Sequence, residues 1–218
     1  MKIKILNLYA GIGGNRKLWT GDIEVTAVEN VPEIAKIYQD FFPNDKVIVC
    51  DAHQYLLEHY KEFDFIWSSP PCPSHSKVRY ANQIQNAPIF PSMILYEEIL
   101  FLQGYFKGKF VVENVISWYE PLIKPQVCGS HYYWTNFPIS QVSKLDNKGR
   151  AMGKDECRDG LTKSRGFDIS KYDGIDKTKI LRNCLEPELG LHVFKMAFKE
   201  KQNTLEELKS QVEKGEKL

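Results

Sequence analysis

The sequence predicts an α/β protein with a mostly parallel, doubly wound sheet. In residues 1–115, short apolar runs of strand length alternate with helix-like segments, the pattern of a parallel sheet covered on both faces. The composition, 43% hydrophobic and 26% charged, is typical of a packed globular protein. A chain of 218 residues is long enough for one domain with a substantial core.

The elements can be assigned in order from these runs. Strands are expected at residues 2–8, 23–29, 46–50, 63–68 and 109–113. Helices are expected at residues 14–20, 32–42, 52–60 and 92–106, with Pro32 as an initiating residue and Ser92 as a cap.

The regular alternation ends after Val115. Residues 1–138 are expected to form the catalytic and cofactor-binding core, and residues 139–179 a short basic loop or small lobe. Residues 180–218 are expected to return to the core, as a strand and helix over 180–198 and a terminal docking helix over 203–218. Thr204 and Glu207 form a capping-box pattern for that last helix.

Charge and cysteine content limit the class of protein. The formal net charge of +1 does not by itself predict a polyanionic partner. Residues 144–182, however, hold eleven Lys and Arg against seven Asp and Glu, which fits either a nucleic-acid-facing loop or a solvated insertion. The five cysteines are scattered without a C-x-x-C pair, so neither a disulfide framework nor a zinc site is expected.

Targeting signals are not evident in the sequence. No apolar stretch approaches the length of a membrane helix, and the first residues do not resemble a signal peptide. We therefore expect a cytoplasmic protein.

Candidate ligand-binding residues follow the first three strands. Residues 9–14 (YAGIGG) form a glycine-rich loop, and a helix starting after it would offer free N–H groups to an anionic group. Glu29 ends the second strand, where an acid can bind ribose hydroxyls, and Asp51 follows the third, where it can accept from an adenine amino group. Each acid alone is more often a surface charge or helix cap. Together they indicate an adenosine-containing cofactor, either a dinucleotide or a methyl donor.

The fourth strand leads into Ser68-Ser69-Pro70-Pro71-Cys72-Pro73-Ser74. A single cysteine is most often a small buried hydrophobic residue. Here the prolines stiffen the loop and hold Cys72 at the ligand edge of the sheet, opposite the glycine loop, which favours a nucleophile. The fifth strand ends in Glu113-Asn114-Val115, which places a carboxyl group at the neighbouring loop.

The ordered set YAGIGG, Glu29, Asp51, PPC and ENV resembles the catalytic core of the cytosine carbon-5 DNA methyltransferases over about residues 3–137. Residues 131–138 (HYYWTNFP) are most similar to the corresponding stretch of the animal de novo DNA methyltransferases. The resemblance implies a Rossmann-like S-adenosylmethionine-dependent methyltransferase fold with a small recognition insertion. It also implies DNA as the substrate.

The resemblance also implies roles for individual residues. Cys72 would add to carbon 6 of cytosine, Glu113 would share a proton with ring nitrogen 3, and Asn114 would support the catalytic loop. The implied S-adenosylmethionine site comprises Tyr9, Ala10, Gly11, Gly13, Gly14, Glu29, Asn30, Asp51, Ala52 and Pro70. The implied contacts to the nucleic acid are Ser76, Lys77 and Arg79, in a loop over residues 73–91 that closes on the strand after base flipping.

Two features depart from the family pattern. Gly129 and His131 occupy the positions of an R-x-R pair whose second arginine contacts the base. His131 could donate the same hydrogen bond, or it could be a structural histidine. In addition, only residues 140–179 are available for target recognition, and residues 182–190 do not match the family's last cofactor motif convincingly.

Three hypotheses therefore remain open. The leading one is a compact DNA methyltransferase of the phage or restriction-modification type, acting in the bacterial or infected host cytoplasm. The second is a tRNA cytosine carbon-5 methyltransferase, and the third a weakly active cofactor-binding subunit that needs a DNA-recognition partner. A dinucleotide-dependent oxidoreductase would leave PPC and ENV unexplained, and the sequence does not indicate an oligomeric state.

Overall fold

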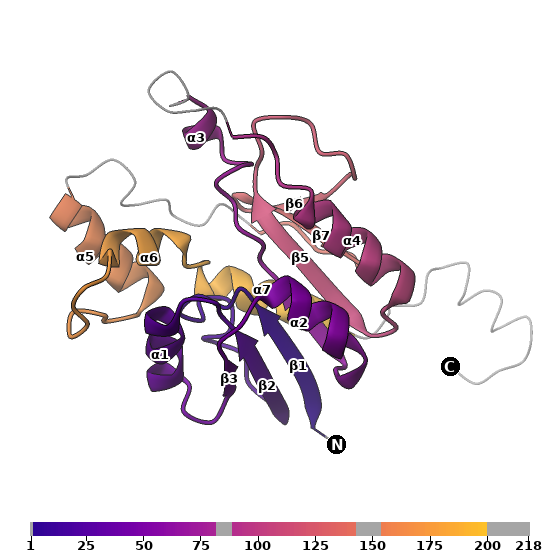
Figure 1. The fold of residues 1–218 in the computed structure, drawn as a ribbon, viewed down its shortest axis with the longest axis horizontal. Coiled ribbons are helices and arrows are strands. Elements are labelled where there is room, and N and C mark those ends of the chain that lie inside the picture. Colours follow the sequence, from indigo (N-terminus) through magenta and orange to yellow (C-terminus); the bar gives the residue numbers. More distant parts are fainter. Residues whose placement is uncertain (1, 82–88, 143–153, 200–218) are drawn as a thin grey trace, which may run out of the picture.

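The computed structural model describes residues 2–81, 89–142 and 154–199, which build a seven-stranded sheet (Figure 1). The strands are β1 Ile3–Leu8, β2 Ile23–Val28, β3 Lys46–Ile48, β4 Phe65–Ser68, β5 Lys109–Val115, β6 Gln126–Cys128 and β7 His131–Thr135. Their order is β3-β2-β1-β4-β5-β7-β6, with β1 to β5 parallel and β7 and β6 antiparallel. The chain crosses over between β1 and β4, which is where ligands bind in such sheets.

Helices cover both faces of the sheet. They are α1 Pro32–Phe41, α2 Ala52–His59, α3 Lys77–Ala81, α4 Ile94–Tyr105, α5 Lys154–Arg165, α6 Lys177–Asn183 and α7 Pro187–Ala197, with a 3₁₀ turn at Tyr60–Glu62. Because side chains alternate along a strand, Ile5 packs with Phe194 of α7, and Leu6 packs with Leu56 of α2 and Ile99 of α4. The prediction of a mostly parallel, doubly wound sheet is confirmed.

The five predicted strands, and the predicted helices over 32–42, 52–60 and 92–106, agree with the structure to within two residues. Pro32 occupies the first turn of α1 as expected. Ser92 does not cap α4, because the N-cap of α4 is Met93. The Ser92 N–H instead donates to Ser74 Oγ at 3.1 Å.

The helix predicted over residues 14–20 is wrong, because this segment forms consecutive turns. Gly13 has φ 86°, and a Cβ on Gly14 would lie 2.5 Å from Cys184 Sγ and from the Leu185 carbonyl. Asn15 is buried and donates to Asn7 Oδ1 at 2.7 Å. Two adjacent glycines are poor helix formers, and tertiary packing determines the conformation instead.

The C-terminal part also differs from the prediction. Residues 180–198 form no strand; they contain the end of α6, a short connection and α7, and α7 begins with Pro187 in its first turn. The β6–β7 hairpin, α3 and α5 were not predicted. The terminal helix expected over residues 203–218 lies outside the described residues.

The predicted lobe over residues 139–179 includes α5, which packs beside α6 at the α1 end of the sheet (Figure 1). None of the helices within residues 2–81, 89–142 and 154–199 is long and apolar enough to cross a membrane.

Close packing of α7 on the glycine loop gives a stability prediction. A Cβ on Gly190 of α7 would lie 2.6 Å from the backbone of Asn15, whereas a Cβ on Gly104 of α4 meets nothing within 4 Å. We expect Gly190→Ala to lower the free energy of unfolding by about 1–3 kcal/mol through overpacking. The matched control Gly104→Ala should raise it by about 0.5–1 kcal/mol through higher helix propensity. Urea denaturation of both variants measures this, and an equal effect of the two would contradict the packing model.

Candidate active site

Most of the predicted catalytic and cofactor residues lie at the carboxyl ends of the parallel strands β1 to β5. In the sheet register, Leu8 of β1 pairs with Ser68 of β4, and Ser68 pairs with Val112 of β5. Three features therefore lie at the same level of the sheet: the start of the glycine loop, the start of the Ser69–Cys72 loop, and Glu113. This is the ligand edge expected for a doubly wound fold.

The loop that carries Cys72 is held by hydrogen bonds on both sides. Asn114, which is buried, donates from Nδ2 to the Pro70 carbonyl at 2.9 Å. The Cys72 carbonyl accepts from the His75 and Ser76 amides at 2.9 and 3.0 Å. The Cys72 side chain is partly exposed, so a fixed backbone presents a reachable thiol.

Glu113 is the buried acid of this site, with 8% of its surface exposed. The pKa of Glu113 is raised, mainly by burial. The charge of His131 and a hydrogen bond from Ser69 act in the opposite direction, and the charge of Glu186 adds to the increase. Burial also raises the pKa of Cys72, and the charge of Glu113 adds to that effect. The carboxyl and the thiol therefore interact electrostatically, and both environments favour the neutral forms.

Gly129 lies in the two-residue turn of the β6–β7 hairpin, and His131 is the first residue of β7. Gly129 has φ 59°, and a Cβ there would meet Leu189 Cδ2 at 3.2 Å, so an arginine at this position would be strained. His131 Nε2 lies 3.6 Å from Glu113 Oε1, a distance for an ion pair when the imidazole is protonated. His131 Nδ1 lies 3.2 Å from Ser130 Oγ.

The glycine loop has the geometry of a ligand-binding turn. Tyr9 and Gly11 adopt positive φ values of 53° and 55°, and the space over the Gly11 Cα is open. Buried Glu29 accepts from the Gly11 and Val31 amides, each at 3.0 Å. A carboxylate has about four acceptor sites, so Glu29 retains capacity for ribose hydroxyls. This arrangement fits an adenosine-containing cofactor, although no helix follows the loop to supply the N–H groups expected there.

Asp51 caps α2, because its Oδ1 accepts from the Gln54 amide at 2.8 Å. Asp51 can act both as a helix cap and as an acceptor for an adenine amino group, because its second carboxylate oxygen is a further acceptor. Asn30 is exposed after Glu29, Ala52 is buried at the start of α2, and Pro70 is buried above Asn114. Ala10 is buried, and Gly14 packs against Cys184 and Leu185. Ala10 and Gly14 therefore shape the glycine loop through packing against the protein interior.

The three residues predicted to contact nucleic acid follow Cys72. Ser76 forms an isolated bridge with Ser117, and Lys77 is exposed at the start of α3. Arg79 belongs to α3, and its side chain is outside the described part of the chain. Tyr80 stacks on Trp118 with ring centroids 4.3 Å apart, which joins α3 to the segment after β5.

Sequence reasoning missed several polar residues near the site. Glu98, fully buried in α4, accepts hydrogen bonds from Tyr9 and Ser68. Arg165 Nη2 pairs with Glu186 Oε1 at 2.7 Å, and Glu186 immediately precedes α7. Glu98 could have been noticed, because its spacing from Leu95 and Leu102 places a carboxylate on the apolar face of a helix, where it requires partners.

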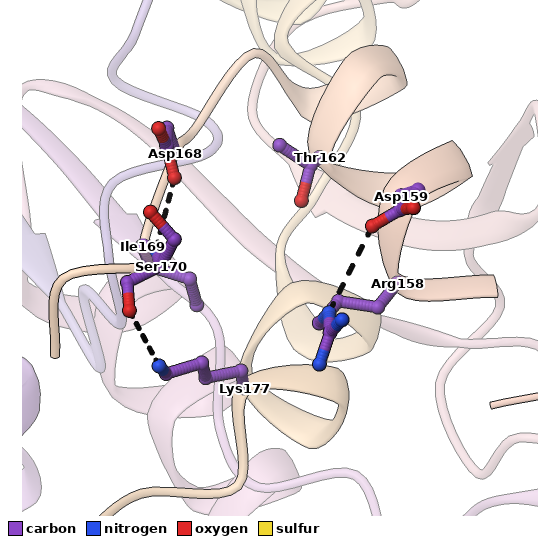
Figure 2. A pocket seen from close by; sticks show the side chains of 7 residues that line it. All are labelled: Arg158, Asp159, Thr162, Asp168, Ile169, Ser170 and Lys177. Carbon is purple, nitrogen blue, oxygen red and sulfur yellow. Dashed lines mark hydrogen bonds and ion pairs between the residues drawn. The ribbon is translucent and has the colours of Figure 1, made fainter. Parts of the chain in front are cut away.

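A separate hollow of about 320 Å³ lies in the predicted recognition segment (Figure 2). It is lined by Arg158, Asp159, Thr162, Asp168, Ile169, Ser170 and Lys177. Its cations contact groups in the same wall: Lys177 Nζ donates to the Ser170 carbonyl at 2.6 Å, and Arg158 lies 3.8 Å from Asp159. The hollow includes none of the predicted catalytic or cofactor residues.

Comparison with known proteins gives a family and a fold. The model of the C-5 cytosine-specific DNA methylase family matches residues 3–118. The structure of the Entamoeba histolytica methyltransferase EhMeth is similar with a TM-score of 0.58 at 12% identity, covering 93% of this chain and 100% of that one. A mutant of DNMT2 from Spodoptera frugiperda gives a TM-score of 0.46 at 22% identity, covering 66% and 54%. The comparison with curated proteins gave no match.

The family match covers more than half of the chain and includes the glycine loop, Glu29, Asp51, PPC and ENV. The fold is that of S-adenosylmethionine-dependent methyltransferases. The chain therefore belongs to the C-5 cytosine-specific DNA methylase family, and it transfers a methyl group from S-adenosylmethionine to carbon 5 of cytosine in nucleic acid.

Proposed function

We propose that Cys72 and Glu113 act as a nucleophile and proton-donor pair on a cytosine that has been flipped out of duplex DNA. The observation that carries this proposal is the placement of buried Glu113 on β5, beside the strand whose loop carries Cys72, with the next residue, Asn114, bonded to the Pro70 carbonyl of that loop. The charge of Glu113 is also one of the causes that raise the pKa of Cys72. Carbon 5 of cytosine is a weak nucleophile. Addition of a thiolate to carbon 6 turns the ring into an enamine that is nucleophilic at carbon 5.

Glu113 provides the complementary charge. Thiolate addition pushes electrons toward ring nitrogen 3, and a protonated carboxyl facing that atom donates its proton there. The raised pKa of Glu113 keeps this proton available closer to neutral pH. Asn114 acts indirectly, because its hydrogen bond to Pro70 holds the loop that carries Cys72.

The cofactor side of the site would be formed by the glycine loop, with Glu29 toward the ribose and Asp51 toward the adenine. S-adenosylmethionine, when bound, supplies the electrophilic methyl group. Glu29 would also stabilise the conformation of the glycine loop, because its carboxylate accepts hydrogen bonds from the Gly11 and Val31 amides.

We further propose that the substrate is duplex DNA. We also propose that the enzyme acts in the cytoplasm of a bacterial or infected cell, where both the DNA and the methyl donor are present. Ser76, Lys77 and Arg79 follow the nucleophile in the sequence and would contact the strand. The segment available for recognition is short, so target selectivity should be relaxed or supplied by a protein partner. A tRNA substrate is the alternative within the same chemistry.

The direct test offers duplex DNA, single-stranded DNA and tRNA to the chain with methyl-labelled S-adenosylmethionine. We expect label in duplex DNA, recovered as 5-methylcytosine, and its loss in Cys72→Ser, because a hydroxyl is not ionised near neutral pH. The matched control is Cys50→Ser, which alters a partly exposed thiol away from Glu113 and should retain activity. Label in tRNA alone would replace the DNA substrate, and cofactor binding without any transfer would support the partner-dependent hypothesis.

The pH dependence of the rate tests the pairing of Cys72 and Glu113. Reaction requires Cys72 deprotonated and Glu113 protonated, so the rate should pass through a maximum and fall on both sides. Glu113→Gln cannot lose a proton. We expect its rate to be about 10²-fold lower at the optimum, and to rise with pH to a plateau instead of falling. The midpoint of this rise should lie at a lower pH than the pKa of wild-type Cys72, because the Glu113 charge that raises that pKa is gone. A bell-shaped profile retained in the glutamine variant would exclude Glu113 as the titrating acid.

A further inference from the structure

Glu98 is a buried carboxylate without a role in the proposed reaction. It lies on the apolar face of α4 with Leu95 and Leu102, and none of its surface is exposed. An acid in this environment is costly unless hydrogen bonds compensate for the lost hydration. Its partners therefore indicate what it contributes.

Three side chains from three different elements lie against the Glu98 carboxylate. Tyr9 Oη donates to Oε1 at 2.6 Å, and Ser68 Oγ donates to Oε2 at 2.5 Å. His53 Nδ1 lies 3.1 Å from Oε1. Tyr9 follows β1, Ser68 ends β4, and His53 is in the first turn of α2, so one carboxylate joins all three positions.

Tyr9 is the partner with the least favourable backbone. Its φ of 53° is in the left-handed region, where a residue with a Cβ is strained by about 1–2 kcal/mol. The hydrogen bond to Glu98 fixes the ring end of this residue, two positions before the Gly11 amide that donates to Glu29. Glu98 thereby stabilises the strained start of the glycine loop.

Ser68 and His53 connect Glu98 to the remaining parts of the site. Ser68 is fully buried and precedes the segment from Ser69 to Cys72, whose Pro70 carbonyl is held by Asn114. His53 follows Asp51 by two residues, and its other ring nitrogen lies 3.5 Å from exposed Glu97. The same carboxylate thus supports the loops expected to bind the cofactor and the loop expected to carry the nucleophile.

We propose that Glu98 is a positioning residue that couples the cofactor loop to the nucleophile loop, through Tyr9 on one side and Ser68 on the other. The part that concerns catalysis rests on the proposed function of Cys72. The part that concerns S-adenosylmethionine affinity is independent of it.

The first experiment measures S-adenosylmethionine binding by calorimetry, with no nucleic acid present. Glu98→Gln keeps the size of the side chain and removes its charge, and we expect at least about a 10-fold weaker affinity, equivalent to about 1.4 kcal/mol. The matched control is Glu97→Gln, which removes the charge of the neighbouring acid on α4. The Glu97 side chain is mostly exposed, and its Oε1 lies 3.5 Å from His53 Nε2. This control should change the affinity less than about 2-fold.

Two further variants separate the arms of the network and remain informative if Glu98→Gln does not fold. Tyr9→Phe removes one hydroxyl, and we expect weaker S-adenosylmethionine binding that is not additive with Glu98→Gln. Ser68→Ala removes the other, and we expect a lower kcat with nearly unchanged S-adenosylmethionine affinity. A residue that only stabilised the fold would produce no such split.

The proposal is overturned if folded Glu98→Gln binds S-adenosylmethionine as the wild type does. It is equally overturned if Tyr9→Phe and Ser68→Ala leave both affinity and kcat unchanged. If the wild type binds S-adenosylmethionine but methylates no nucleic acid, the proposed function fails, whereas the calorimetric comparison still decides whether Glu98 supports the cofactor loop.

Discussion

The register of three parallel strands determines the relative positions of the glycine loop, the Cys72 loop and Glu113. Leu8, Ser68 and Val112 are paired across β1, β4 and β5, so the loops that leave these strands begin side by side. Buried aromatic and aliphatic residues on both faces make a shift of this register costly, because a one-residue slip would turn each of them to the opposite face. Tyr9, Cys72 and Glu113 are therefore placed at the same edge of the sheet although they are far apart in the sequence.

Burial has opposite consequences for the two central side chains. It raises the pKa of Glu113, which favours the proton donor that the reaction needs. It also raises the pKa of Cys72, which disfavours the thiolate that must attack. Burial at the ligand edge thus favours one member of the pair at the expense of the other, and the rate depends on the balance between them. Glu186 and His131, with opposite effects on Glu113, are the nearby groups that adjust this balance.

Much of the fold and the main site residues could be predicted from the sequence because their signals are local. Apolar runs identified the five parallel strands, and the loops after them contained the glycines, Cys72 and Glu113. The helix predicted after the glycine loop does not form. Two adjacent glycines gave a local signal against it, but the close approach of Cys184 and Leu185 to Gly14 could be seen only in the folded chain. Glu98 was missed for a related reason: its partners Tyr9, His53 and Ser68 come together only in the folded chain.

The assignment of Cys72 as the nucleophile can be tested by trapping its adduct. An oligonucleotide with 5-fluorocytosine, in place of cytosine, lacks the carbon-5 proton whose removal expels the thiolate, so the covalent complex should persist when S-adenosylmethionine is present. Mass spectrometry should find the protein heavier by the oligonucleotide and one methyl group, with the modification on the Cys72 peptide. Cys72 would be excluded as the nucleophile if the wild type methylated ordinary DNA but formed no adduct, or if the adduct were on Cys50, Cys128, Cys157 or Cys184.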